Sequence, residues 1–369
     1  MSEPMKKILV VFGTRPEAIK MCPLVIELKR HKELKVIVCV TGQHKEMLKQ
    51  VLDVFGIEPD IDLSIMKDNQ NLVDITSSIL QKMQVVLKNI EPDLVLVHGD
   101  TTTSFSTSLA CFYLNVKIGH VEAGLRTYDI DSPFPEEFNR TAISLVSTMD
   151  FAPTNLAKEN LLREGKDETN IWVTGNTVID ALKYTVKSEY SSEEIDWIGD
   201  SKLIFVTAHR RENIGQPMRQ MFRAIKRILN EYENFKVIYP VHLNPEVRKI
   251  ANEELDKIDR IHLIEPVDVI TCHNLMAKAY LILTDSGGIQ EEAPSLHKPV
   301  LVMREVTERP EGVKAGTLKL VGTKEETIYE SFKELIKDND LYNKMVNAVN
   351  PYGDGNACER IAKIILDNL

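Results

Sequence analysis

The chain has 369 residues, of which 43% are hydrophobic and 27% charged, as is typical of a globular protein. Its formal net charge of −10 argues against a surface that binds nucleic acid, and no apolar run is long enough to span a bilayer. The length exceeds what one ordinary core requires and predicts two domains.

The first residues and the cysteines favour a cytoplasmic protein. The chain runs from charged residues directly into an apolar segment, without the pattern of a secretory signal. Its five cysteines are widely spaced, form no CxxC pair and stand in apolar surroundings. We therefore expect reduced core thiols and neither a disulfide nor a metal site.

Strands and helices alternate through the first half of the chain. The strands are expected at residues 7–12, 34–40, 93–97 and 117–121, and the helices at 15–30, 44–55, 72–88, 103–114, 136–147, 156–164 and 177–187. Continuous apolar strands of this kind are typical of a parallel sheet that is buried on both faces. Residues 188–200 lose this periodicity and gain charge and serine, which predicts a linker.

The second half repeats the alternation. Its strands are expected at residues 203–207, 236–241, 262–264, 279–284, 300–303 and 318–321, with helices between them and at the end of the chain. Two open parallel sheets place ligands at the carboxyl ends of their strands, where the polar clusters of this sequence fall. A cleft between two domains is the expected site, with hinge closure as its motion.

The segment HVEAGLRTYDIDSPFPEEFNR, residues 120–140, crowds carboxylates between a strand and a helix. Asp100, Glu122 and Glu136 each stand at a strand or helix end and could share one pocket, where each would raise the pKa of the others. Arg126 and Arg140 allow the alternative of structural ion pairs, and the sequence leaves both open. His120 precedes Glu122 by two residues, so in a strand both would face one side, which suits acid/base chemistry better than zinc binding.

Three further motifs suit a nucleotide. GTRPEAIK fails as a P-loop, but Arg15 and Lys20 suit an anion at a helix start; a solvated basic pair is the alternative. Ser286-Gly287-Gly288 precedes a helix whose free N–H groups could hold a phosphate, and a glutamate one turn later could bind ribose hydroxyls, unless this is an ordinary helix surface. His209 could donate a proton to a leaving diphosphate, or belong to an exposed basic turn.

Seven segments together resemble the non-hydrolysing UDP-N-acetylglucosamine 2-epimerases. They are FGTRPEAIKMCPL, TGQHKEML, VLVHGDTTTS, HVEAGLRT, PFPEEFNR, VTAHRREN and TDSGGIQEEAP, which stand in the family's order and cover essentially the whole chain. The resemblance implies reversible conversion of UDP-GlcNAc to UDP-ManNAc, by elimination of UDP to 2-acetamidoglucal and re-addition, with no cofactor and no metal.

The resemblance also assigns residues. The catalytic group would be Asp100, Glu122, Glu136 and His209, and the UDP-binding group Arg15, Lys20, Arg140, Ser286, Gly287, Gly288 and Glu292. A second nucleotide-sugar, bound as an activator, would contact Gln43, His44, Arg210 and His242. Which carboxylate takes the C2 proton stays open. Asn69 stands where bacterial members commonly carry arginine, so we expect weaker dependence on the activator.

The family architecture implies an α/β fold of the GT-B type, with two Rossmann-like doubly wound domains and a C-terminal helix that crosses back. The expected domains are residues 1–187 with 357–369, and residues 188–356. The family is commonly dimeric, and we expect no nucleic-acid or membrane partner. The alternatives are a hydrolysing epimerase that releases ManNAc and UDP, a GT-B glycosyltransferase, or a nucleotide-sugar sensor, which would not need the three acids.

Overall fold

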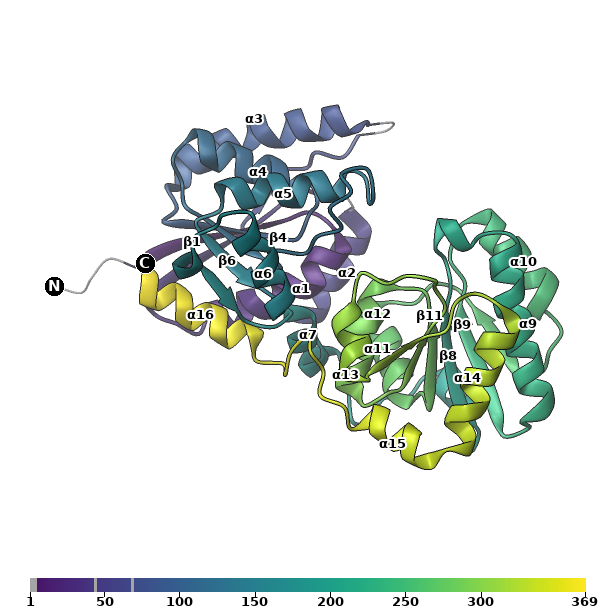
Figure 1. The fold of residues 1–369 in the computed structure, drawn as a ribbon. Coiled ribbons are helices and arrows are strands. Elements are labelled where there is room, and N and C mark those ends of the chain that lie inside the picture. Colours follow the sequence, from purple (N-terminus) through teal and green to yellow (C-terminus); the bar gives the residue numbers. More distant parts are fainter. Residues whose placement is uncertain (1–4, 43–44, 68–69) are drawn as a thin grey trace. The chain divides into compact units, whose positions relative to one another are not determined.

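The computed structural model describes residues 5–42, 45–67 and 70–369. The chain forms two compact units (Figure 1), one made of the residues up to Tyr184 together with Tyr352–Leu369, the other of Thr185–Pro351. The sequence placed these two boundaries slightly later in the chain, after residue 187 and not after Tyr184, and after residue 356 and not after Pro351. In the described parts of the chain, no helix is long and apolar enough to cross a membrane.

The N-terminal unit is built on a parallel sheet, which has seven strands within the described residues. Their order is β3-β2-β1-β4-β5-β6-β7. The central strands β1 and β4 are buried apolar runs, apart from the two partly exposed lysines that begin β1. They are buried because helices cover both faces of the sheet. The strands are β1 (Lys6–Phe12), β2 (Leu34–Val40), β3 (Ile61–Asp62), β4 (Leu94–His98), β5 (Ile118–Val121), β6 (Met149–Ala152) and β7 (Ile171–Val173).

The helices of this unit come from both ends of the chain. They are α1 (Arg15–Leu28), α2 (Lys45–Phe55), α3 (Leu72–Ile90), α4 (Thr102–Tyr113), α5 (Glu136–Val146), α6 (Asn155–Arg163), α7 (Thr177–Thr185) and α16 (Ala357–Asn368). The last helix packs against α1 (Figure 1). It places Ile361 and Ile365 in the same core as Leu24. The expected return of the C-terminal helix is thus confirmed.

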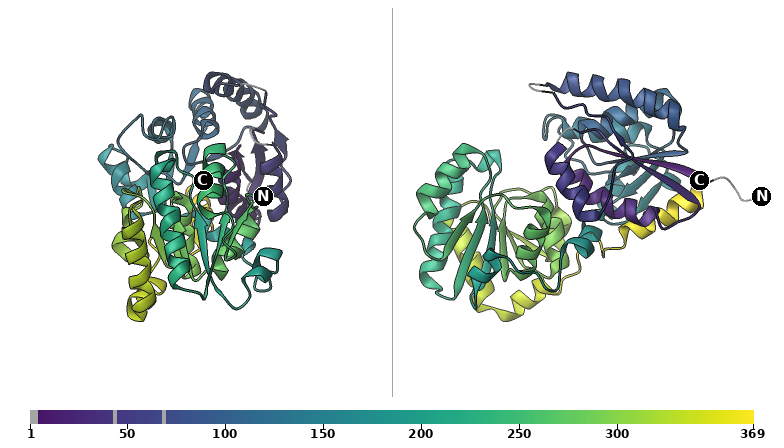
Figure 2. Two further views of the ribbon diagram at one scale, coloured as in Figure 1. Left: turned by 90° about the vertical axis from the view of Figure 1, so that its right-hand side faces the viewer. Right: turned by 180° about the vertical axis from the view of Figure 1, so that it is seen from behind.

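The C-terminal unit repeats this plan with a parallel sheet ordered β10-β9-β8-β11-β12-β13. Figure 2 shows helices on both faces of each sheet. The strands are β8 (Lys202–Thr207), β9 (Phe235–Pro240), β10 (Ile261–Ile264), β11 (Leu281–Thr284), β12 (Val300–Val302) and β13 (Leu318–Leu320). The helices are α8 (Glu193–Ile198), α9 (Gln216–Glu231), α10 (Pro245–Leu255), α11 (Val269–Lys278), α12 (Gly287–Glu292), α13 (Pro310–Ala315), α14 (Glu325–Lys337) and α15 (Asn339–Val346).

Each sheet reverses its strand order once, between β1 and β4 in the N-terminal unit and between β8 and β11 in the C-terminal unit. The loops that follow the two strands diverge at such a point and leave a crevice at the carboxyl edge. The doubly wound α/β fold expected from the sequence is therefore confirmed in both units. Polar motifs of the sequence directly follow all four of these strands.

The prediction of a linker at residues 188–200 is wrong, because this segment contains helix α8. Ser192 caps the helix by accepting from the N–H of Ile195, and Ile198 is buried in the core of the C-terminal unit. Trp197 adds a ring contact with His262. High charge and serine content marked a surface helix here and not an unstructured connection.

Candidate active site

Asp100 follows β4 and lies among charged groups of the N-terminal unit. Its carboxylate is 2.7 Å from Nη2 of Arg140, and its carbonyl accepts from Nδ2 of Asn139 at 2.8 Å. Burial raises the pKa of the Asp100 carboxyl; Arg140 opposes this, while Glu122 and Glu136 add to it. The structure therefore brings the three predicted carboxylates into one electrostatic neighbourhood.

Glu122 occupies the first position after β5 and is the most tightly held of the three. Its φ of 65° is in the left-handed region, which a glutamate adopts only where its surroundings enforce it. The carboxylate pairs with Nζ of Lys20, accepts from Nδ2 of Asn176 at 2.8 Å and lies 3.7 Å from Nε2 of His98. Burial raises its pKa, but Lys20 and His98 outweigh this and hold it well below the usual range. Glu122 is thus ionised.

Glu136 is the first residue of α5 and is partly exposed. Of the two arginines that left the carboxylates ambiguous, Arg126 pairs with Glu164 instead, at 2.6 Å. Arg140 does pair with Asp100. The site therefore combines both interpretations of the sequence: a carboxylate cluster, and ion pairs of Arg140 with Asp100 and of Lys20 with Glu122.

A buried carboxylate that the sequence reasoning missed, Glu17, ties two loops of this site together. It accepts from the N–H groups of Gly13 and Thr14 at 3.0 and 2.8 Å, and from the hydroxyls of Thr101 and Ser104 at 2.6 and 3.2 Å. The loop before Arg15 and the loop after Asp100 are thereby fixed to each other. The capping-box spacing of threonine and glutamate in TRPE was the available signal.

His120 does not share the role of Glu122 that the strand alternation predicted. It is fully buried in β5, its Nε2 bonds the carbonyl of Gly99 at 2.7 Å, and burial lowers its pKa to about 3. The ring is therefore neutral and structural. The alternation rule fails because β5 ends at Val121, and Glu122 has left strand geometry.

The proposed phosphate-binding turn lies at the start of α12 in the C-terminal unit. Ser286 stands at the N-cap without a side-chain cap bond, followed by Gly287 and Gly288. A Cβ at Gly287 would lie 2.7 Å from Nη1 of Arg309, so this guanidinium lies directly against the turn. The sequence reasoning missed Arg309, which also pairs with Glu291 at 2.8 Å. A cation that is paired with a glutamate thus lies against the turn predicted to hold a phosphate.

Glu292, predicted on the ribose, ends α12, and its Oε2 is 3.1 Å from Nε2 of His273. This histidine is buried and its Nδ1 bonds the hydroxyl of Thr185 at 2.7 Å. The carboxylate of Glu292 is therefore held in a fixed orientation.

His209 follows β8, and its ring stacks on that of His242 with centroids 5.4 Å apart. Burial lowers its pKa, Asp285 opposes this, and His242 and Arg210 lower it further. Arg210 donates from Nε to the carbonyl of Asp285 at 3.1 Å. Of the residues predicted for a second nucleotide-sugar, Arg210 and His242 thus lie beside His209, whereas Gln43 and His44, with Asn69, lie outside the described residues.

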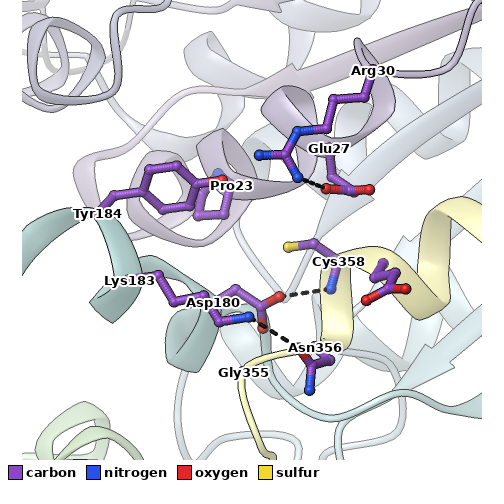
Figure 3. Close-up of a pocket in the computed structure, with 10 residues that line it drawn as sticks. Pro23, Glu27, Arg30, Asp180, Lys183, Tyr184, Gly355, Asn356 and Cys358 are labelled. Carbon is purple, nitrogen blue, oxygen red and sulfur yellow. Dashed lines mark hydrogen bonds and ion pairs between the residues drawn. The ribbon is translucent and has the colours of Figure 1, made fainter.

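A separate pocket of about 320 Å³ lies where α16 begins (Figure 3) and contains none of the predicted site residues. The carboxylate of Asp180 accepts from the N–H groups of Ala357 and Cys358 at 3.2 and 3.0 Å. Lys183 donates to Oδ1 of Asn356 at 3.0 Å. These contacts anchor the returning C-terminal segment, so we interpret this pocket as part of the fold.

Residues 26–366 match the family model described as UDP-N-acetylglucosamine 2-epimerase. A protein of that name from Bacillus subtilis (strain 168) is 58% identical over 360 residues, which cover 98% of this chain and 95% of the relative.

Two solved structures agree with the fold. The UDP-GlcNAc 2-epimerase from Neisseria meningitidis, bound to UDP-GlcNAc, has a TM-score of 0.90 and 49% identity over 98% of this chain and all of that one. The enzyme from Methanocaldococcus jannaschii, in complex with UDP-GlcNAc and UDP, has a TM-score of 0.81 and 34% identity over 98% and 100%. The chain therefore belongs to the UDP-N-acetylglucosamine 2-epimerase family.

Proposed function

We propose that this protein interconverts UDP-GlcNAc and UDP-ManNAc without net hydrolysis. The observation that carries the proposal is a group of neighbouring carboxylates in which Lys20 pairs with Glu122 and Arg140 pairs with Asp100. Lys20 and His98 keep Glu122 charged, whereas burial raises the pKa of Asp100. Titratable groups whose pKa values are driven apart in one site are suited to separate roles as proton acceptor and proton donor.

The chemistry needs such a pair, because the C2 hydrogen of the sugar is not adjacent to a carbonyl group. In the elimination, a base takes the C2 proton, the C–H electrons form the C1–C2 double bond, and the C1–O bond breaks to release UDP. Re-addition returns UDP to C1 and a proton to the opposite face of C2. We assign Glu122 as proton acceptor in one direction, with Asp100 and Glu136 as the groups that supply the proton on the other face.

A clamp must keep UDP in place between the two steps. We assign it to the residues that the family resemblance implies, which are Arg15, Lys20, Arg140, Ser286, Gly287, Gly288 and Glu292. The close approach of the Arg309 guanidinium to Gly287 supports a diphosphate at this turn. His209 would protonate the departing diphosphate.

The activator site stays a proposal of the same kind. Arg210 and His242 are neighbours of His209, which would let a second nucleotide-sugar act on the protonation of that ring. Because position 69 is an asparagine and not an arginine, we expect the activity to depend less on the activator. Strongly sigmoidal UDP-ManNAc kinetics that trace UDP-GlcNAc abolishes would contradict this.

The function is tested by incubating the protein with UDP-GlcNAc in D₂O, without added NAD or metal, and following C2 by NMR. The expected result is UDP-ManNAc that carries deuterium at C2 and reverts to UDP-GlcNAc. Accumulation of free ManNAc would instead establish the hydrolysing reaction. No exchange at C2, with UDP bound, would leave a nucleotide-sugar sensor or a glycosyltransferase.

We also propose a homodimer. Large apolar side chains that are exposed gather on three helices of the N-terminal unit, α3, α4 and α5; they are Leu72, Val73, Val85, Phe112, Tyr113, Phe138 and Leu145. These helices pack side by side along the chain order, α3 on α4 and α4 on α5. An apolar surface on neighbouring helices is typical of contact with another copy.

A further inference from the structure

Asp285 is fully buried at the end of β11, directly before the glycine turn, and collects donors from the loop after the neighbouring strand β8. Its Oδ2 accepts from the N–H groups of His209 and Arg210, each at 2.9 Å. The same oxygen accepts from Nδ2 of Asn213 at 3.1 Å. One carboxylate therefore holds the start and the end of this loop.

The topology explains why one side chain reaches the whole loop. Strands β8 and β11 are parallel neighbours, with Thr207 in register with Thr284, so the residues that follow them meet at the same edge of the sheet. A buried carboxylate is stable only when donors compensate its charge, and successive backbone N–H groups do so while fixing the path of the chain. Asp285 thus determines where the His209 backbone lies.

The contact extends to the imidazole ring. Nδ1 of His209 lies 3.5 Å from Oδ1 of Asp285, and no carboxylate of comparable proximity to Nε2 is found among the described residues. The environment of one ring nitrogen decides which nitrogen carries the proton of the neutral form. A carboxylate beside Nδ1 favours the proton there.

We propose that Asp285 is the positioning residue of His209: it fixes the loop and keeps the proton of the neutral ring on Nδ1, so that Nε2 exchanges a proton with the leaving diphosphate. The part of this inference that concerns diphosphate rests on the function proposed above. Asp285 itself acts through the histidine and touches neither reacting carbon.

The charges around His209 predict in which direction its proton affinity changes when Asp285 is replaced. The ring faces His242 and Arg210, which disfavour its protonated form, and Asp285 and Glu212, which favour it. Replacing Asp285 by asparagine keeps the shape of the side chain but removes the negative charge. The proton affinity of His209 should fall, and with it the fraction of protein whose histidine is a proton donor at neutral pH.

The first test uses the unaltered protein and does not depend on activity. The protein is labelled with ¹⁵N at its histidine rings, and the His209 signals are identified by their loss in His209→Gln. We expect the neutral ring to carry its proton on Nδ1. A neutral ring protonated on Nε2 would overturn the proposal, whether or not any Asp285 variant folds.

The second test compares the pH titration of the His209 ring in Asp285→Asn and in the unaltered protein. We expect the midpoint to move to lower pH; an unchanged midpoint contradicts the proposal. Tyr239→Phe is the matched control. It removes the hydrogen bond of 2.6 Å that Tyr239 Oη donates to the carbonyl of Ala208 on the same loop, and it leaves the charge of Asp285 in place. A midpoint that moves equally in the control would also overturn the proposal.

Kinetics extend the test to the proposed reaction. In Asp285→Asn, kcat should fall by about tenfold or more at neutral pH, and the alkaline limb of its pH profile should move to lower pH. If the unaltered protein does not epimerise UDP-GlcNAc, the proposed function fails while both ring measurements still decide the role of Asp285. If it does epimerise and the alkaline limb of Asp285→Asn does not move, the positioning role fails alone.

Discussion

The ammonium group of Lys20, on α1, pairs with the carboxylate of Glu122, 102 residues later in the chain. Their side chains are only 14% and 10% exposed, so solvent screens the pair weakly. Replacing either partner by a neutral side chain of similar shape leaves the charge of the other in poorly solvated surroundings but keeps the packing, so the effect measured is that of charge. Conservative substitutions at this pair are therefore the most informative.

Glu122→Gln should abolish most turnover while sparing UDP binding. Glutamine keeps the volume and can still accept from Asn176, but it takes no proton, so the rate should fall by roughly 10²- to 10⁴-fold. Deuterium exchange at C2 measures the rate, and calorimetry measures UDP affinity. Asp131→Asn, an exposed carboxylate of the same segment, is the control. A Glu122→Gln protein with near-normal exchange would refute the assignment of this residue.

Lys20→Met should change the pH dependence as well as the rate. Lys20 is a main cause of the low pKa of Glu122, so its loss raises that pKa. A proton acceptor must be ionised, and the acidic limb of the pH profile of kcat should therefore move to higher pH. Saturating UDP-GlcNAc separates this effect from weaker substrate binding. Lys49→Met is the control, because it removes an exposed pair with Asp53 and should leave the acidic limb in place. An acidic limb that also stays in place in Lys20→Met would show that Glu122 is not the proton acceptor.

The sequence predicted the strands that are continuous apolar runs, including the three-residue strands β12 and β13, and missed β3, β6 and β7. β1, β2 and β8 were predicted within one residue of their ends. β6 contains the buried Asp150, whose charge is balanced by Lys166 at 2.9 Å. A charged residue in a short apolar segment predicts a loop, because the sequence pattern does not show that a distant lysine compensates the charge.

The same limit applies to the candidate site. Motif order pointed to Asp100, Glu122 and Glu136, and the structure places them in one neighbourhood; their roles stay a prediction. Asn176 and Arg309 were missed because each acts on a partner that only the fold brings near. Contacts between residues far apart in the chain are what the sequence pattern could not supply.

Asp180→Ala should destabilise the N-terminal unit through the start of α16. The carboxylate caps two N–H groups there, and loss of a helix cap costs about 1–2 kcal/mol. Urea denaturation followed by the fluorescence of Trp172, in a Trp197→Phe background, measures the change in the N-terminal unit. Glu359→Ala alters the same pocket without removing the cap and should change stability by less. Equal effects of the two variants would argue against the capping role.

Phe112→Glu should convert the proposed dimer into a monomer. The side chain is 56% exposed at the end of α4, and a charge there must be desolvated if the surface is covered by a second copy. Light scattering coupled to size-exclusion chromatography gives the mass directly. Val349→Glu, in the C-terminal unit, is the control, because it places the same charge at an apolar side chain that is 84% exposed. A monomeric unaltered protein, or a dimeric Phe112→Glu variant, would rule out this surface.

Glu308→Gln should lower stability in a way that depends on pH. Burial raises the pKa of Glu308, but the paired bonds from Arg304, at 2.7 and 2.9 Å, hold it at about 2, below the ordinary value of 4.5. The native state thus binds this proton less readily than the unfolded chain, so the ionised carboxylate stabilises the fold above pH 4.5 and ceases to do so as pH falls toward 2. Because the side chain is one third exposed, the difference in unfolding free energy should be about 1 kcal/mol at neutral pH.

Denaturant titrations of both proteins between pH 7 and the lowest pH at which they remain folded measure this difference. The gap between Glu308→Gln and the unaltered protein should narrow as the pH falls below 4.5, since both then approach a neutral side chain at this position. Glu330→Gln removes an exposed partner of Lys333 and should give a small difference at every pH. A gap for Glu308→Gln that is constant across the range would mean that shape, and not charge, accounts for its contribution.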